Sequence, residues 1–179
     1  MHLINFTEVE KTIVNALQDF LKKVIGKDVP VIMANQVSPT PEYPYISYTI
    51  TTPVMASTVH YSVSESGVRY KPLKQIWSFT VQSGAYSETA DISLYAYDFF
   101  NDISNTQFKD AGIVVVRVGG ITNRDNMLSI EYEHRNGFDV TFSLMHTIDA
   151  SLIENGKIEE IAIANAIKDI TITKEGENP

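Results

Sequence analysis

Acidic side chains in the second half of the chain could bind a metal ion. Glu131, Glu133 and Asp139 lie close together in the sequence, with His134 between them. Carboxylates and imidazole can hold a divalent cation that activates water, so the group is compatible with a small hydrolase or nuclease. However, neighbours on a strand point to opposite faces, which separates His134 from Glu133. We keep hydrolysis as an alternative and predict an acidic row facing solvent or a partner, with no metal, cofactor or enzyme activity.

Other catalytic motifs are missing from the sequence. The four histidines form no HExxH or HxH pattern, and no GxSxG surrounds a serine. The glycines do not form GxGxxG or GxxxxGK[ST], so the usual phosphate-binding loops are missing as well. Cysteine does not occur, which excludes disulfides and thiolate metal sites. The motifs therefore support neither nucleotide binding nor nucleophilic catalysis.

A basic group offers the nearest candidate for nucleic-acid binding. Arg69, Lys71 and Lys74 lie at the base of a predicted hairpin, but a single-strand binder needs basic residues interleaved with its aromatic residues. The formal net charge is -8, from 22 acidic and 14 basic residues, without a block of either sign. Because such a surface repels phosphate chains on average, specific nucleic-acid binding is disfavoured. We expect the basic group to meet an acidic neighbouring subunit.

The first half of the chain predicts one helix and several strands. Thr7 and Glu10 form a capping box before an amphipathic helix that ends at Gly26. A loop with three prolines, residues 35–44, must be extended and stiff. The polar, β-rich stretch 57–70 predicts a long hairpin that projects from the core. Apolar alternation predicts strands at residues 29–34, 45–52 and 75–82.

A second helix is predicted from residue 87 to about residue 103, with Ser87 as its cap. Its apolar residues wrap too far around the helix for contact with one sheet alone. This distribution predicts burial on a second side as well. Tyr95, Tyr97 and Phe100 are the candidates for that second contact.

An amphipathic hairpin is predicted beyond residue 123, because apolar residues occupy every even position in 128–132 and 138–144. We place its turn at Arg135–Gly137, with Gly137 in the left-handed conformation of a bulged loop. This register sets Glu133 opposite Asp139. Two like charges opposite each other on paired strands destabilise the fold by about a few tenths of a kcal/mol. We therefore expect Arg135, Arg124 or a neighbouring subunit to lie near Glu133 and Asp139 and compensate their charges.

These elements predict an α+β fold: a mixed, mostly antiparallel β-sheet packed against two α-helices, with a protruding β-hairpin. Residues 113–118 form a near-continuous apolar run, which is typical of a central strand. We expect one domain over residues 1–150 and a C-terminal extension over 151–179, extended because isoleucine dominates it, with a frayed end. No segment predicts a bilayer span or a signal peptide, so we expect a soluble, unexported protein.

Several short loop and strand motifs stand in a particular order. They are Ala34-Asn35-Gln36, Pro39, Pro41, Pro44-Tyr45-Ile46-Ser47-Tyr48, Asn123-Arg124-Asp125, Tyr132-Glu133, Arg135 and Gly137-Phe138-Asp139-Val140-Thr141-Phe142. In order and spacing, this set resembles the neck or tail terminator proteins of tailed bacteriophages and prophages. The resemblance covers about residues 7–145 and leaves the role of 151–179 open.

The resemblance implies a structural virion protein that assembles as a ring, usually hexameric, at the head-proximal end of the tail. Such a ring halts growth of the tail tube and joins the tail to the head connector, while DNA passes through its centre without specific binding. The implied partners are further copies of the chain, the tail-tube protein and connector proteins, with tail sheath as a further candidate. Assembly would take place in the host bacterial cytoplasm, without a membrane. A head-completion or connector-ring protein of the same particle is the alternative.

A ring subunit needs two different contact surfaces, because one face of each copy joins a different face of the next. The second helix and the projecting hairpin are the sequence-based candidates. Acidic walls around a DNA channel would also let a polyanion slide rather than bind. The predicted interface residues are Arg69, Lys71, Lys74, Tyr95, Tyr97, Phe100, Glu131 and Glu133.

Overall fold

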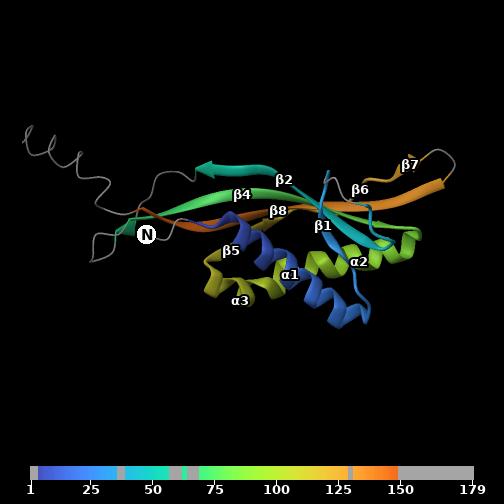
Figure 1. The fold of residues 1–179 in the computed structure, drawn as a ribbon, viewed down its shortest axis with the longest axis horizontal. Helices are drawn as coiled ribbons and strands as arrows, with labels where there is room; N and C mark the ends of the chain where they lie inside the picture. Colours follow the sequence, from blue (N-terminus) through green and yellow to red (C-terminus); the bar gives the residue numbers. More distant parts are fainter. Residues whose placement is uncertain (1–3, 36–38, 57–61, 64–68, 129–130, 149–179) are drawn as a thin grey trace, which may run out of the picture.

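A twisted sheet carries the helices on one of its faces, and the other face is free of helices (Figure 1). The computed structural model describes residues 4–35, 39–56, 62–63, 69–128 and 131–148. The strands are β1 (Val31–Met33), β2 (Tyr45–Ala56), β3 (Ser62–Val63), β4 (Arg69–Ser83), β5 (Ile113–Val118), β6 (Thr122–Asn123), β7 (Asn126–Leu128) and β8 (Glu131–Ile148). The helical segments are α1 (Phe6–Ile25), α2 (Tyr86–Asp98), the π-helical turn η1 (Phe99–Ile103), α3 (Ser104–Phe108) and the 3-10 turn η2 (Lys109–Ala111).

The strand order across the sheet is β1-β2-β4-β8-β5. β1 and β2 run parallel, whereas β2, β4, β8 and β5 pair with their neighbours in antiparallel fashion. The shorter β3 pairs with β4, and β6 and β7 pair with β8. The predicted α+β fold with a mixed, mostly antiparallel sheet is therefore confirmed.

Helix α1 ends where the sequence predicts but begins with a different cap. The side chain of Asn5 accepts hydrogen bonds from the backbone N–H groups of Thr7 at 3.2 Å and Glu8 at 3.4 Å. The predicted capping box of Thr7 and Glu10 is therefore wrong, because Asn5 already satisfies the first free amides. Gly26 ends the helix in the left-handed conformation, with φ 79°, as expected for a glycine cap. The buried stripe of α1 consists of Ile13, Leu17 and Leu21.

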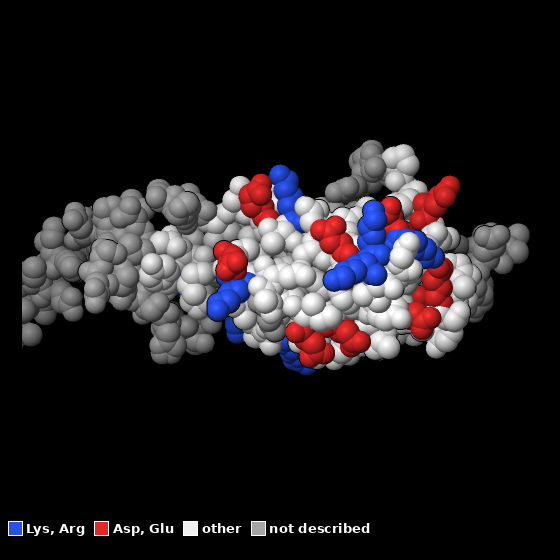
Figure 2. Space-filling view, turned by 90° about the horizontal axis from the view of Figure 1, so that it is seen from below, with Lys and Arg blue, Asp and Glu red and all other residues white. Residues whose placement is uncertain are grey.

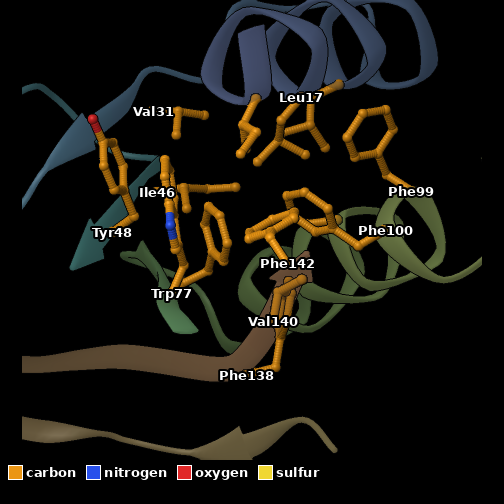
Figure 3. Close-up of a cluster of buried hydrophobic side chains, with 14 of the residues drawn as sticks. Leu17, Val31, Ile46, Tyr48, Trp77, Phe99, Phe100, Phe138, Val140 and Phe142 are labelled. Carbon is orange, nitrogen blue, oxygen red and sulfur yellow. The ribbon is translucent and has the colours of Figure 1, made fainter. Parts of the chain in front are cut away.

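The core lies between the sheet and the helices and is rich in aromatic rings. Figure 3 shows Trp77 and Phe142 of the sheet pointing toward Phe100 and, from α1, Leu17. The ring centroids of Phe79 and Phe100 lie 4.8 Å apart, and those of Trp77 and Phe142 lie 5.5 Å apart. All of these side chains are at most 1 % exposed. Since burying one large apolar side chain is worth about 1.5–3 kcal/mol, this cluster is the main source of stability.

Helix α2 begins at Tyr86, so Ser87 lies inside the first turn and the prediction that it caps the helix is wrong. The N-cap residue is Ala85, and no side chain caps the first amides of the helix; Ser83 Oγ accepts the backbone N–H of Ala85 at 3.2 Å just before the helix begins. After Asp98 the chain remains helical to Ala111 through the π-helical turn η1, α3 and η2, so the predicted end at about residue 103 is wrong. That turn contains Phe99 and Phe100, which are both fully buried.

Strand β5 lies at an edge of the sheet, so the prediction of a central strand is wrong. It pairs with β8, and within the described residues no strand pairs with its other side. Its apolar run is not evidence of burial on both faces, since Val114 is 54 % exposed and Val116 is 50 % exposed.

The predicted turn at Arg135–Gly137 does not exist, because β8 passes through these residues without a break. There β8 pairs with β4, for example Asn136 with Val81. The chain reverses earlier, since Leu128 of β7 pairs with Glu131, and residues 129–130 lie outside the described part. The apolar residues from 132 to 144 therefore lie on one long strand, which pairs with β4 from His134 onward, whereas Leu128 lies on β7.

The described residues include only part of the predicted protruding hairpin. β2 and β4 pair as far as Ala56 and Leu73, and Ser62 of β3 pairs with Tyr70. Residues 57–61 and 64–68 lie outside the described part, as does the predicted extension 151–179 with its boundary at residue 150. No helix among the described residues combines the length and apolar character that a bilayer span requires.

Candidate functional site

The acidic residues of the sequence-based metal site do not converge. Glu133 lies opposite Asn126, whereas Asp139 lies opposite Ser78, so the predicted Glu133–Asp139 pair is wrong. Six positions separate the two acids along β8, which corresponds to about 20 Å. The side chain of Glu131 lies outside what the structure describes. Among the described residues, no three His, Asp or Glu side chains form a group that could hold a metal ion.

Arg124 lies across the helix-free face of the sheet and links β4 to β8. Its Nη1 donates to Ser78 Oγ at 2.8 Å and to Thr80 Oγ1 at 3.0 Å, both on β4. Its Nη2 lies 3.2 Å from Asp139 Oδ1 on β8. A Cβ atom on Gly137 would lie 2.5 Å from the guanidinium carbon, so only glycine leaves room for this arginine. The sequence-based expectation that Arg124 lies near Asp139 is confirmed. Its stated reason is wrong, because Asp139 lies opposite Ser78 and not opposite Glu133.

The Asn123–Asp125 segment ties the short strands β6 and β7 to β8. Asn123 Oδ1 accepts the N–H of Asp125 at 2.8 Å, which forms a tight local turn. Asp125 Oδ1 in turn accepts the N–H of Arg135 at 2.7 Å, and Arg124 N–H donates to the carbonyl of Arg135 at 2.7 Å. The hydrogen bond from the Arg135 backbone, followed by that from Asn123 and the proximity of His134, lowers the pKa of Asp125.

Glu133 is a buried carboxylate that anchors the proline-rich loop. It is 4 % exposed and accepts a hydrogen bond from Arg135 Nε at 2.6 Å. The hydroxyl of Tyr43, at the end of that loop, donates to the other carboxylate oxygen at 2.7 Å. Partial desolvation and this hydrogen bond raise the pKa of Tyr43 to about 12. The Tyr43 ring also stacks on Tyr45, with centroids 5.6 Å apart. Glu133, predicted as part of an acidic surface row, therefore holds the fold together instead, whereas the prediction for the Glu131 side chain lies outside the described part.

The predicted interface residues of the second helix occupy different environments. Tyr95 is 38 % exposed and faces outward. Tyr97 is half-buried and packs edge-on against Phe138, with centroids 6.0 Å apart. Phe100 lies in the π-helical turn and is fully buried in the subunit's own core. Part of the apolar surface that predicted a second contact is therefore buried within the subunit itself.

The predicted basic group does not form one patch. Lys71 pairs with His146 and Lys74 with Ser143 along an unbroken stretch of β4. Since the two lysines are three residues apart on one strand, their side chains point to opposite faces of the sheet. The backbone of Arg69 pairs with β3 and β8, and its side chain lies outside the described part.

The structure exposes two apolar surfaces; the sequence analysis missed the first, at β5, and predicted the second, on the second helix, without Leu94. Val114, Val116 and Met145 are each at least 50 % exposed at the β5 edge of the sheet. On α2, Leu94 is 52 % exposed beside Tyr95. The helical spacing of charged residues around Leu94 was a signal that could have added it to the second surface. The near-continuous apolar run of β5 gave no signal for the first surface, because it was interpreted as a buried central strand.

Charge on the helix side is distributed in small groups. Figure 2 shows acidic and basic side chains interspersed there, with broad uncharged stretches between them. No single-sign field covers this face, which agrees with the absence of charge blocks in the sequence.

Comparison with known proteins identifies the family. A family model described as phage neck terminator protein matches residues 11–176, so the matched region also includes most of the C-terminal segment that the sequence-based resemblance left out. A comparison with curated proteins gives no match. The match covers nearly the whole chain and agrees with the resemblance found in its loop and strand motifs. The chain therefore belongs to the phage neck terminator proteins, and its role is that of a structural protein in the neck and tail of a bacteriophage virion.

Proposed function

We propose that the protein forms a ring at the head-proximal end of the phage tail, where it ends polymerisation of the tail tube and joins the tail to the head connector. The observation that carries this proposal is the family match over residues 11–176. The partners in this proposal are further copies of the chain, the tail-tube protein and the connector proteins.

The asymmetry of the subunit supports assembly as a ring. This subunit has a helix-covered face and a helix-free face that is rich in serine and threonine, including Ser78, Thr80, Thr141 and Ser143. Two unlike faces allow one face of each copy to join a different face of the next copy, as a closed ring requires.

The charge of the chain supports passage of DNA rather than its capture. The net charge of -8 disfavours binding to a polyanion, and acidic walls around a channel would let DNA slide. We assign the protein no specific nucleic-acid site.

Tail length in particles made without the protein tests the proposal. A phage lacking this gene should produce tails of variable, excessive length, and supplying the protein in trans should restore one length, as measured by electron microscopy. Tails of normal length that remain separate from filled heads would contradict tube termination and would indicate a head-completion role instead.

A further inference from the structure

The outer side of α2 carries a stripe of apolar residues flanked by aspartates. Asp91, Leu94, Tyr95 and Asp98 are spaced by three, four and seven positions from the first, so they lie on one side of the helix. The opposite side packs inward, with Ile92, Ser93 and Ala96 buried. We call the four outer residues the α2 patch.

A recess borders the α2 patch and could receive an apolar side chain. It has a volume of about 420 Å³ and lies between the end of α1 and the start of α2. Val24, Ile25 and Ile92 contribute apolar side chains to its lining, and Asp91 and Tyr95 of the α2 patch lie at its border. Lys27 and Glu88 also line the recess and form an ion pair, so a contact at this place would combine an apolar anchor with the acidic Asp91 at the rim.

The β5 edge of the sheet carries the opposite combination. On the helix-free face, Lys74 of β4 pairs with Ser143 of β8, which pairs with Val114 of β5, so the three form one row across the strands. Arg117 is exposed in the row beside it, opposite Thr141. We call this surface the β5 patch; it consists of Lys74, Val114, Val116, Arg117 and Met145.

In the part of the chain that the structure describes, the charged residues of the two patches form no ion pairs. Among the described residues, no ion pair includes Asp91 or Asp98 of the α2 patch. The same holds, in that part of the chain, for Lys74 and Arg117 of the β5 patch. Each patch therefore presents exposed apolar side chains beside two charged residues. The charges of the α2 patch are negative, and those of the β5 patch are positive.

We propose that the α2 patch of one copy of the chain binds the β5 patch of the next copy. This inference rests on the proposed ring function and names the two surfaces that the ring would use. The two patches are different surfaces on opposite sides of the sheet, so the contact between copies is heterologous. An open chain of copies has one free α2 patch at one end and one free β5 patch at the other, until the ring closes. Apolar side chains supply the contact area, and the charge pairs fix the register between copies.

The neighbouring copy would contact the side chains of β5 rather than pair one of its own strands with the free backbone edge of β5. The pairing of β5 with β8 shifts between Val115 and Arg117, which marks a bulge. A bulge and a charged residue on an edge strand hinder backbone pairing with another strand. The exposed valines remain available for contact through the face of the sheet.

Cysteine cross-linking tests the contact directly, because the natural chain contains no cysteine. Oxidation of the double variant Leu94→Cys/Val114→Cys should give a ladder of covalent oligomers, both with the purified full chain at high concentration and in assembled necks. An equimolar mixture of the two single variants should give heterodimers only. Absence of cross-links in both preparations, or efficient homodimers of either single variant, would overturn the proposal.

Charge exchange tests the complementarity of the two patches. Asp91→Lys/Asp98→Lys and, separately, Lys74→Glu/Arg117→Glu should each weaken self-association about tenfold or more, measured by sedimentation equilibrium. All four substitutions in one chain should restore association. The matched control Asp19→Lys/Glu42→Lys changes the same charge at exposed sites outside the patches and should have little effect.

The outcome can be separated from the test of the proposed function. If tails lacking the protein are overlong but the fourfold variant does not regain association, the termination role stands and the assignment of the two patches is wrong. If tails have normal length without the protein, the proposed function itself is wrong.

Discussion

Replacing Gly137 by alanine should destabilise the protein only because Arg124 lies above it. The backbone of Gly137 lies within β8 and does not have a positive φ, so alanine is compatible with its conformation. The new methyl group, however, would lie 2.5 Å from the guanidinium of Arg124. The arginine must therefore move and lose its hydrogen bonds to Ser78 and Thr80.

The size of the effect follows from these contacts. The side chain of Arg124 is 31 % exposed, so water replaces part of each lost interaction, and we assign about 1 kcal/mol to each of the two short hydrogen bonds. Alanine returns about 0.5 kcal/mol because it restricts the unfolded chain more than glycine does. The net loss is then about 1.5 kcal/mol, which corresponds to a decrease in Tm of about 3–6 °C for a chain of this size.

A double-mutant cycle measures this coupling. Urea unfolding can be followed through Trp77, the single tryptophan, which is 1 % exposed in the folded protein. Gly137→Ala should destabilise the wild-type background but should stabilise the Arg124→Ala background by about 0.5 kcal/mol. An equal loss in both backgrounds would refute the reasoning, because the methyl group would then clash with something other than Arg124.

The two acids near the start of β8 give the remaining predictions. Asp125 has a lowered pKa, so its stabilising effect is complete above the ordinary value of about 3.9 and is lost as the pH falls through the folded value. Asp125→Asn should therefore flatten the loss of stability below about pH 4, measured by urea unfolding at a series of pH values; an unchanged slope would contradict this. Glu133→Leu should cost about 2–3 kcal/mol because it leaves Arg135 unpaired, whereas Glu133→Leu/Arg135→Leu should cost clearly less. Equal losses for the single and double variants would show that the ion pair is not the source of the effect.

Local patterns predicted the helices and the class of the fold well. Gly26 marked the end of α1, because a glycine after an amphipathic stripe readily adopts the left-handed conformation. The second helix was predicted to end at about residue 103, but the chain stays helical to Ala111 through η1, α3 and η2, and the sequence did not reveal this continuation or the π-helical turn. Helix caps were less predictable, since several nearby polar residues can satisfy the first amides and Asn5 competes with Thr7.

The β8 region shows where sequence patterns mislead. Arg135-Asn136-Gly137 has the composition of a turn, yet the alternation of apolar residues is the same for one long strand as for two paired strands. Gly137 is required by the arginine that lies across it rather than by a turn. Arg124 and Arg135 do pair with Asp139 and Glu133, although the argument that named these arginines assumed a Glu133–Asp139 pair that does not form.

The amino-acid order alone was sufficient to assign the α+β class and the phage neck terminator family, since helix periodicity, strand alternation and loop motifs are local properties of the chain. The folded structure was needed to learn which residues meet. Tyr43 and Glu133 are 90 positions apart, and Arg124 and Ser78 are 46 apart, yet each pair is joined by a hydrogen bond. Such contacts depend on the order and register of the strands, which make β5 an edge and leave its valines exposed. Because strand pairing is a long-range choice among many possible neighbours, no local pattern specifies it.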